Sequence, residues 1–315
     1  MHDTEGRHIE YLRLSITDRC NCRCQYCMPA EGVPKLRHQD ICSFEELAHI
    51  TQVMTEMGVH KVRITGGDPL VRRGVVDFVA MLHAIPGIDE LTMTTNGLEL
   101  PRLAKPLKEA GLDRLNISLD TLNPELYHWI TRTGTLDQAL DGIQAAREAG
   151  FTHTKFNAVL MGGINDTEVP ELVKLTKDRS YEVRFIELMP MGPCAVWPRE
   201  RFIPADTVLK LVPDLKPIDH EGVAELYQVP GWKGKVGLIR PLSNRFCAGC
   251  TRVRVTADGK LKPCLHTANE INLRGLNDDE LRATIQRGIA LKPLHHELLE
   301  HHRSDALRDM NEIGG

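Results

Sequence analysis

The chain has 315 residues, of which 42% are hydrophobic and 26% charged, and its formal net charge is −4. This composition is typical of a globular protein with room for one large domain and a smaller one. The overall balance gives no reason to expect a nucleic acid or a membrane as a partner, so any cationic site must be local.

The first ten residues are polar, and no later stretch stays apolar for the length of a membrane span, so we expect a cytoplasmic protein. Its nine cysteines are too sparse for a disulfide scaffold and fall mainly in two groups, at residues 20–27 and 247–264. In a reducing compartment this clustering favours metal or redox chemistry over disulfide bonds.

From residue 11 to about residue 188 the sequence alternates short strand-like runs with longer helix-like runs. Apolar residues at every second position predict strands at residues 12–17, 61–65, 90–94, 114–118, 154–159 and 182–187. After the first strand, Ser43 and Glu46 form a capping box that predicts a helix. Further helices are predicted at residues 75–84, 101–110, 136–149 and 167–177. This alternation predicts a parallel sheet with right-handed crossovers.

One face of the predicted strands is polar, which is unusual for parallel strands buried on both faces. Its basic members are Arg13, Lys61, Arg63, Lys155 and Arg184. A closed eight-stranded barrel fills its interior with branched apolar side chains instead. We therefore predict an α/β fold with an incomplete, six-stranded parallel βα barrel that holds a polyanionic ligand. The alternative is that each basic residue lies in water at the mouth of its strand.

After about residue 226 glycine and proline become frequent and the alternation of strand and helix ends. We place a boundary between residues 221 and 226, which gives a barrel domain at 1–225 and a smaller C-terminal domain at 226–315. A terminal helical stretch is predicted at residues 278–310. Its histidine pairs, at 295–296 and 301–302, are expected on a solvated helix face.

The first cysteine group directly follows the first predicted strand. Cys20, Cys24 and Cys27 have the spacing Cys-x3-Cys-x2-Cys. A cubane iron–sulfur cluster usually takes four thiolates, so three leave one iron open to a substrate or cofactor. Spacing alone also allows a zinc site or a ligand set that includes Cys22. The position favours an active site, because active sites of βα barrels collect where the strands end.

This motif, with Tyr26 before the last cysteine, resembles the signature of the radical S-adenosylmethionine superfamily. The resemblance implies a [4Fe–4S] cluster whose open iron binds S-adenosylmethionine, and Cys22 is then a spare thiol. The turn Thr-Gly-Gly-Asp-Pro at residues 65–69 is similar to the superfamily's Gly-Gly-Glu-Pro turn, which implies that Gly67 receives the methionine amino group. Asp68 replaces the usual glutamate, so only the backbone contacts of this turn are expected to carry over.

The second cysteine group has the spacing Cys247-x2-Cys250-x13-Cys264. His266 lies two residues further on, so a structural zinc site with three cysteines and one histidine is an alternative to a cluster. Spacing alone makes zinc at least as good an interpretation as iron and sulfide.

The two cysteine groups, the basic barrel lining and several verbatim stretches resemble one family, the GTP 3′,8-cyclases (MoaA) of molybdenum cofactor biosynthesis. The stretches are Leu-Arg-Leu-Ser-Ile-Thr-Asp-Arg-Cys, Lys-Val-Arg-Ile-Thr-Gly-Gly, Thr-Thr-Asn-Gly, Asn-Ile-Ser-Leu-Asp, Arg-Phe-Ile-Glu, Cys-Thr-Arg-Val-Arg and the terminal Ile-Gly-Gly. They run from residue 12 to residue 315, so the resemblance covers essentially the whole chain.

The resemblance implies that Cys247, Cys250 and Cys264 bind a second [4Fe–4S] cluster, carried by the C-terminal domain, whose open iron binds the guanine of GTP. The implied barrel contacts to GTP, chiefly to its triphosphate, are Arg13, Lys61, Arg63, Thr94, Lys155 and Arg184. Arg252 and Arg254, on one face of a strand, resemble the family's substrate-binding arginines. The implied contacts to S-adenosylmethionine are Tyr26, Gly67, Ser118 and Met189. The sequence contains no P-loop, so cations of this kind would have to hold the triphosphate.

The last two residues, Gly314 and Gly315, would ordinarily be interpreted as a frayed terminus. The resemblance implies instead that this diglycine tail enters the active site and acts in catalysis, at a place where only a residue without a side chain fits.

The implied reaction converts GTP into (8S)-3′,8-cyclo-7,8-dihydroguanosine 5′-triphosphate: a 5′-deoxyadenosyl radical removes the ribose C3′ hydrogen, and the C3′ radical attacks C8 of guanine. Implied partners are an electron donor for the first cluster and the pterin synthase enzyme that uses the product. A homodimer is compatible with the sequence.

Two other classes of function compete with this interpretation. A peptide-modifying radical enzyme with an auxiliary cluster would need a peptide groove rather than a cationic interior. An electron-transfer or zinc-binding structural protein would differ in its iron and sulfide content.

Overall fold

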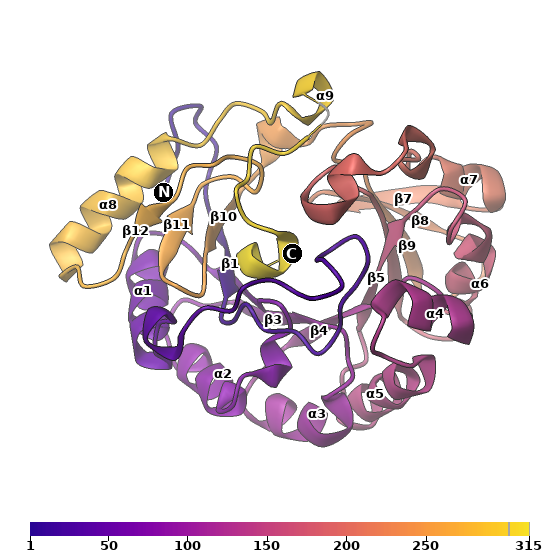
Figure 1. The fold of residues 1–315 in the computed structure, drawn as a ribbon. Coiled ribbons are helices and arrows are strands. Elements are labelled where there is room, and N and C mark those ends of the chain that lie inside the picture. The colour runs from indigo at the N-terminus through magenta and orange to yellow at the C-terminus, as the bar shows by residue number, and fades with distance from the viewer. Residues whose placement is uncertain (302, 315) are drawn as a thin grey trace.

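The computed structural model describes residues 1–301 and 303–314, and it is built around one sheet with an outer layer of helices (Figure 1). The strand order is β12-β11-β10-β1-β2-β3-β4-β5-β6-β9-β8-β7. The central strands are β1 (Tyr11–Ser15), β2 (Lys61–Thr65), β3 (Glu90–Thr95), β4 (Arg114–Ser118), β5 (Lys155–Leu160) and β6 (Glu182–Glu187). They pair in parallel with their sequence neighbours. The predicted order of strands and the parallel, barrel-like sheet are therefore confirmed.

Parallel pairing extends beyond the predicted six strands. β10 (Arg252–Val255) pairs in parallel with β1, and β9 (Lys235–Ile239) pairs in parallel with β6. Each then continues into antiparallel strands: β11 (Lys260–Lys262) and β12 (Ile271–Asn272) on one side, and β8 (Ala224–Gln228) and β7 (Lys216–Glu221) on the other. β12 and β7 are thus the two edges of an open sheet, and the strand count in the prediction was too low.

The helices that connect the strands cover the outside of the sheet (Figure 1). They are α1 (Phe44–Glu56), α2 (Val75–His83), α3 (Leu100–Glu109), α4 (Pro124–Thr131), α5 (Leu136–Glu148) and α6 (Val169–Lys174). The capping box of α1 is present, since Ser43 Oγ accepts from the Glu46 amide at 3.1 Å and the Ser43 amide donates to Glu46 at 2.6 Å. α4 was not predicted.

The remaining helices are shorter, apart from α8. They are α7 (Thr207–Leu211), α8 (Asp278–Ala290), α9 (Leu298–His301) and α10 (Met310–Ile313). Single 3-10 turns occur at His38–Asp40, Pro69–Val71, Asp166–Glu168, Gly192–Val196, Arg199–Arg201 and Cys247–Gly249. Among the described residues, no helix has the length and apolarity needed to cross a membrane.

The strands divide their side chains between two environments. Leu12, Leu14, Val62 and Ile64 are completely buried against the helices, within one large apolar core. Burial of each such side chain stabilises the fold by about 1.5–3 kcal/mol. A register slip of one residue would move these groups to the inner face, so the core fixes which side chains line the interior.

The C-terminal region differs from the predicted continuous helix. α8 ends at Ala290 shortly before Pro293, which cannot continue a helix. His296, expected on a solvated face, is buried, and its Nε2 lies 3.0 Å from the carbonyl oxygen of Pro241. His302 lies outside the described residues. The proposed domain junction at residues 225 and 226 lies within β8.

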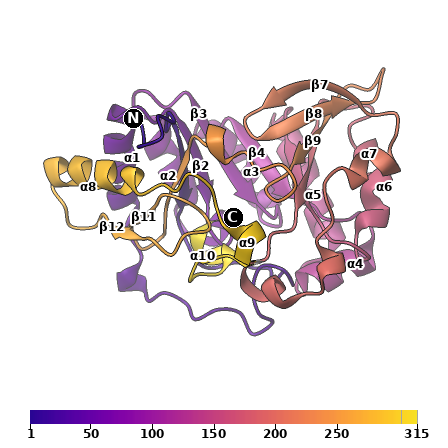
Figure 2. The same cartoon turned by 90° about the horizontal axis from the view of Figure 1, so that it is seen from above.

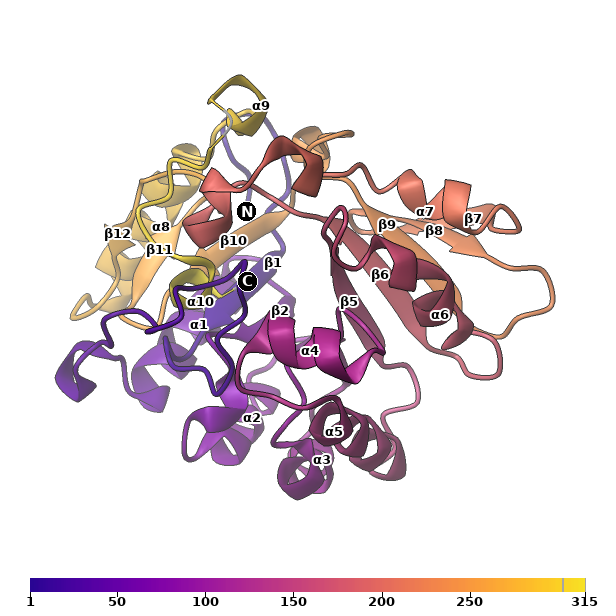
Figure 3. The same ribbon diagram turned by 45° about the vertical axis from the view of Figure 1, so that its right-hand side comes forward.

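The chain then returns to the middle of the molecule. Figures 2 and 3 show α10 and the C-terminus between the two flanks of the sheet. Asn311 Nδ2 donates to the Asp18 carbonyl at 3.0 Å, and Ile313 is completely buried. The C-terminal residues are therefore anchored inside the barrel, close to the first cysteine group.

Candidate active site

One cavity of about 610 Å³ occupies the interior of the barrel, and we call it the chamber. Its lining includes all six cysteines of the two predicted sets, Cys20, Cys24, Cys27, Cys247, Cys250 and Cys264. The two groups are more than 200 residues apart in sequence and meet here because β10 pairs with β1. The structure therefore brings both cysteine sets to one cavity.

The loop that carries the first set is fastened to the end of β2. The Gly67 amide donates to the Thr17 carbonyl at 2.8 Å, and the Asp68 amide donates to the Arg19 carbonyl at 2.8 Å. A Cβ at Gly66 would lie 2.6 Å from the Thr17 oxygen, and a Cβ at Gly67 would overlap with backbone atoms of Arg19. Both glycines are thus required for the close approach of these two backbone segments, and both line the chamber.

Asp68 holds the ends of two strands together. Its carboxylate accepts hydrogen bonds from the Leu70 amide at 2.9 Å, the Asn96 amide at 2.7 Å and the Thr95 hydroxyl at 2.8 Å. Complete burial nevertheless raises the pKa of this carboxyl group to about 6, against the opposing effect of its donors. The shorter side chain is fully engaged with the protein, which gives Asp68 a structural role at the turn.

We expect Asp68→Asn to lower the free energy of unfolding of the cluster-free protein by about 1–3 kcal/mol. The reason is that the amide nitrogen of asparagine cannot accept from a backbone amide, so one buried donor loses its partner. Urea denaturation at pH 8 measures this change. Asp141→Asn, on the exposed face of α5, removes a similar charge and is expected to cost no more than about 0.5 kcal/mol. Equal stability of the two variants would contradict the role given to Asp68.

The predicted contacts to S-adenosylmethionine lie in the same cavity as the first cysteine set. Tyr26, Gly67, Ser118 and Met189 all line the chamber. The Tyr26 hydroxyl donates to Asp120 Oδ2 at 2.9 Å, and Asp120 Oδ1 accepts from the Val159 amide at 2.8 Å. Burial raises the pKa of Asp120 to about 6.

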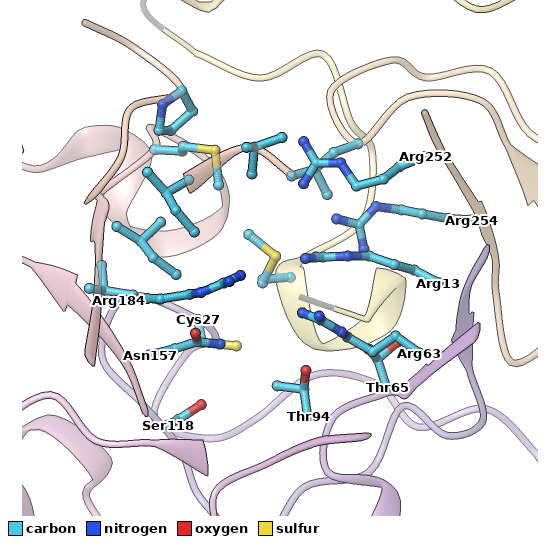
Figure 4. Close-up of a pocket in the computed structure, with 18 of the residues that line it drawn as sticks. Arg13, Cys27, Arg63, Thr65, Thr94, Ser118, Asn157, Arg184, Arg252 and Arg254 are labelled. Carbon is cyan, nitrogen blue, oxygen red and sulfur yellow. The ribbon is translucent and has the colours of Figure 1, made fainter. Parts of the chain in front are cut away.

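Five arginines point into the chamber (Figure 4): Arg13, Arg63, Arg184, Arg252 and Arg254. Burial lowers the pKa of Arg63 to about 9, and no side-chain carboxylate of the described residues lies within ion-pair distance of Arg13, Arg63, Arg252 or Arg254. Arg63 and Arg254 are buried, and Arg13 and Arg252 are partly exposed. Buried guanidinium groups are costly without counter-ions, so these four residues, which we call the arginine wall, favour an anion in the chamber.

The other predicted cations are already paired. Lys61 Nζ lies 3.0 Å from Glu10, and Lys155 Nζ lies 3.2 Å from Glu182. Lys61 and Thr94 line the chamber, whereas Lys155 faces a second cavity of about 440 Å³ at the amino-terminal ends of the strands. Arg184 lies opposite Arg13 and Arg254 in Figure 4. It forms ion pairs with Glu182 and Glu221, the two carboxylates that also pair with Lys155.

The second cysteine set surrounds the start of β10. The positive charges of Arg252 and Lys292 outweigh the effect of burial and lower the pKa of Cys250 to about 6, so this group is a thiolate at neutral pH. Lys292 Nζ donates to the Arg252 carbonyl at 2.7 Å and to the Pro263 carbonyl at 2.9 Å, and Arg7 donates to the Cys247 carbonyl at 3.0 Å. Two buried cations thus position this set.

The thiols of the two cysteine sets are not gathered tightly around single points. Zinc–sulfur bonds of about 2.3 Å in a tetrahedron place sulfur atoms about 3.8 Å apart. Within residues 1–301 and 303–314, neither cysteine set has three ligand atoms within 4.8 Å of one another, even when His266 is included. His266 instead places Nδ1 3.2 Å from Ser304 Oγ. A ring nitrogen of the alternative fourth zinc ligand is therefore engaged with another side chain of the protein.

Gly314 lies where the arginine wall meets β2. Its carbonyl accepts from Arg254, its φ is 76°, and a Cβ at this position would overlap with Thr65 Oγ1 and lie 3.1 Å from Ser15 Cβ. Gly315, the second residue of the predicted tail, lies outside the described residues.

Comparison with known proteins adds independent findings. The Radical SAM superfamily model matches residues 14–176, and the Molybdenum Cofactor Synthesis C model matches residues 181–298. The chain is 48% identical over 320 residues to the GTP 3′,8-cyclase of Alkaliphilus metalliredigens, with full coverage of both proteins. It is 50% identical to the GTP 3′,8-cyclase of Peptoclostridium acidaminophilum, with 99% of this chain and 98% of that protein covered.

The chain belongs to the GTP 3′,8-cyclase family.

Solved structures similar to this cyclase family member are more distant in sequence. Streptococcus suis SuiB bound to S-adenosylmethionine has a TM-score of 0.64 at 16% identity, with 90% of this chain and 68% of that chain covered. Methylornithine synthase (PylB) has a TM-score of 0.55 at 16% identity, with 91% of this chain and 83% of that chain covered. At such identities the likeness shows a shared radical SAM fold and nothing further.

Sequence reasoning missed several residues that shape the site of this family member. Glu187, at the end of β6, accepts hydrogen bonds from the amides of Ala205 at 3.0 Å, Leu242 at 2.9 Å and Ser243 at 2.9 Å. It thereby fixes the segment that leads into the second cysteine set. The available signal was its place in the stretch Arg-Phe-Ile-Glu. Asp120, two residues beyond the end of β4, continues the polar parity of Asn116 and Ser118.

Proposed function

We propose that this chain converts GTP into (8S)-3′,8-cyclo-7,8-dihydroguanosine 5′-triphosphate, the first step of molybdenum cofactor biosynthesis. The observation that carries the proposal is that a single chamber is lined by two three-cysteine sets and by arginines that have no carboxylate partner among the described side chains. Full-length identity of 48% to a GTP 3′,8-cyclase supports this function over peptide modification. The alternative is supported only by a similar fold at 16% identity.

Membership of the radical SAM superfamily brings a [4Fe–4S] cluster and S-adenosylmethionine. In our proposal Cys20, Cys24 and Cys27 hold this cluster, and Tyr26, Gly67, Ser118 and Met189 position S-adenosylmethionine beside it. Bound together, these groups supply a 5′-deoxyadenosyl radical, which serves to join the ribose C3′ of GTP to C8 of its guanine. The protein contributes the carbonyl of Gly67 and the hydroxyls of Ser118 and Tyr26 as fixed polar groups.

In our proposal a second [4Fe–4S] cluster is bound by Cys247, Cys250 and Cys264 and holds the guanine of GTP. The match of the Molybdenum Cofactor Synthesis C model over this set and the full-length identity to GTP 3′,8-cyclases support this assignment. Fixing the base at one end of the chamber and S-adenosylmethionine at the other limits the relative motion of the reacting atoms, which accelerates reaction.

The arginine wall, in our proposal, receives the phosphates. Arg13, Arg63, Arg252 and Arg254 have no carboxylate partner among the described side chains, and a triphosphate would offset the cost of burying Arg63 and Arg254. Lys61, Lys155, Arg184 and Thr94 complete the predicted contacts. We further propose the division into residues 1–225 and 226–315, a cytoplasmic enzyme that is compatible with a homodimer, an external electron donor, and a pterin synthase enzyme that uses the product.

An anaerobic assay tests the proposed function. Protein reconstituted with iron and sulfide is expected to hold about eight irons per chain, as two cubanes require. Given GTP, S-adenosylmethionine and a strong reductant, it should form 5′-deoxyadenosine and a cyclised nucleotide in about equal amounts. Absence of both products would refute the proposal. One cubane accompanied by a zinc ion would refute the second cluster.

A further inference from the structure

The cations around the chamber fall into two electrostatic classes. Those of the arginine wall lack carboxylate partners among the described side chains, whereas Lys155 and Arg184 share two carboxylates, Glu182 and Glu221. Lys155 Nζ lies 3.2 Å from Glu182 and also contacts Glu221, and Arg184 Nη2 lies 3.2 Å from Glu221. This end of the site is therefore neutralised by the protein itself.

The two carboxylates are held in different ways. Glu182 begins β6, which is paired on both sides, by β5 and β9, and its side chain is only 10% exposed. Glu221 is the last residue of β7, an edge strand whose residues are all exposed, and its side chain is 50% exposed. It precedes a turn at Gly222, where φ is 60°. Glu182 is thus part of the barrel, whereas Glu221 is carried by an outer hairpin.

Glu221 also lies where the two cavities meet, since it lines both the chamber and the hollow beside Lys155. The positive charges of Lys155 and Arg184 outweigh burial and hold the pKa of Glu221 at about 2, so it is ionised. Its contact with Arg184 is incomplete, because the buried Nη2 atom of Arg184 has no hydrogen-bond partner among the described residues. The Nη2 group of Arg184 is therefore available as a donor to an anion that approaches it with better geometry.

We propose that Glu221 is a displaceable counter-ion that holds the place of a substrate phosphate on Lys155 and Arg184 until GTP binds. This rests on the proposed function, which assigns the two cations to the triphosphate. A phosphate group carries more charge than a carboxylate and three acceptor oxygens, so it can satisfy Lys155 and the free donor of Arg184 together. Glu182 stays in place, and the β7–β8 turn is released.

The counter-ion has opposite effects on the empty and the occupied protein. It compensates two buried cations when the chamber is empty, and it competes with phosphate when GTP arrives. Removing its charge therefore strengthens binding of a ligand that reaches these cations. Removing the charge should not change the affinity for a guanine nucleotide that lacks the outer phosphates.

Equilibrium binding to the anaerobic holoenzyme tests this proposal with two ligands, GTP and GMP. Glu221→Gln keeps the size of the side chain, and we expect it to lower the Kd of GTP by about 3- to 10-fold while the Kd of GMP changes less than about twofold. Asp219→Asn removes one charge from the same hairpin at an exposed position with no ion pair among the described residues, and it should bind both ligands like the wild type.

Unchanged or weaker binding of GTP by Glu221→Gln, or equal tightening for GMP, would overturn the counter-ion role. If the wild type itself fails to bind GTP, the proposed function fails instead. A second measurement needs no variant: backbone hydrogen exchange in residues 216–228 of the wild type should become faster when GTP binds. Slower or identical exchange in that hairpin would also overturn the proposal.

Discussion

Cys27→Ala is expected to abolish cleavage of S-adenosylmethionine, with a loss on the order of 10³-fold or more, whereas Cys22→Ala is expected to retain it. Removal of one of three ligands leaves the cluster without the coordination that holds it, so iron should be lost together with activity. The two variants remove the same atoms from the same loop. Their difference therefore isolates ligation from any general disturbance of the loop.

The surroundings of the thiols support this choice of ligands. Cys20, Cys24 and Cys27 are partly exposed, whereas Cys22 is 1% exposed. The Cys22 amide lies 3.3 Å from Cys20 Sγ, and Asn96 Nδ2 lies 3.5 Å from Cys22 Sγ. Cys22 is thus the most buried of the four cysteines in this loop, although it also lines the chamber and its amide donates to Cys20 Sγ.

Iron content and 5′-deoxyadenosine formation are the two measurements for these variants. Cys27→Ala should keep about four of about eight irons, because the second set is untouched. If Cys22→Ala lost iron and Cys24→Ala kept it, the ligand set would have to include Cys22, and the superfamily spacing would not apply to this chain.

The barrel could be predicted because its signals are local. Alternating apolar residues on strands such as β2 and β4 fix strand position, and the capping box at Ser43 fixes the start of α1. The pairing of β9 and β10 with the ends of the barrel could not be predicted, since it joins segments distant in the sequence. α4 begins at Pro124 after a loop and is too short to show a clear helical period.

The candidate site divides in the same way. The cysteines, the glycine turn and the alternating basic residues form patterns in the sequence. Most of these residues line the chamber. The carboxylates that neutralise Lys155 and Arg184 come from β6 and from β7, and the pairing with Glu221 across 66 residues leaves no local pattern. The burial of His296 likewise results from its contact with Pro241, a residue 55 positions away.

Gly314→Ala is expected to lower formation of the cyclised nucleotide by about 10²-fold while cleavage of S-adenosylmethionine continues, so that the two products are no longer equal. A methyl group at this position overlaps with Thr65 Oγ1 and approaches Ser15, both in the barrel wall. The tail must then move, and Arg254 loses the Gly314 carbonyl that it contacts. Misplaced guanidinium groups should orient GTP poorly even though the first cluster is intact.

Gly275→Ala provides the matched control. Its φ is 75°, against 76° at Gly314. Alanine in this left-handed conformation should therefore destabilise the fold equally in both variants, by about 1–2 kcal/mol. A Cβ at Gly275 meets nothing within 4 Å. Any excess effect at Gly314 therefore comes from the contact with the barrel wall. Equal product ratios in the two variants would show that the tail tolerates a side chain, and the role predicted for Gly314 in catalysis would be wrong.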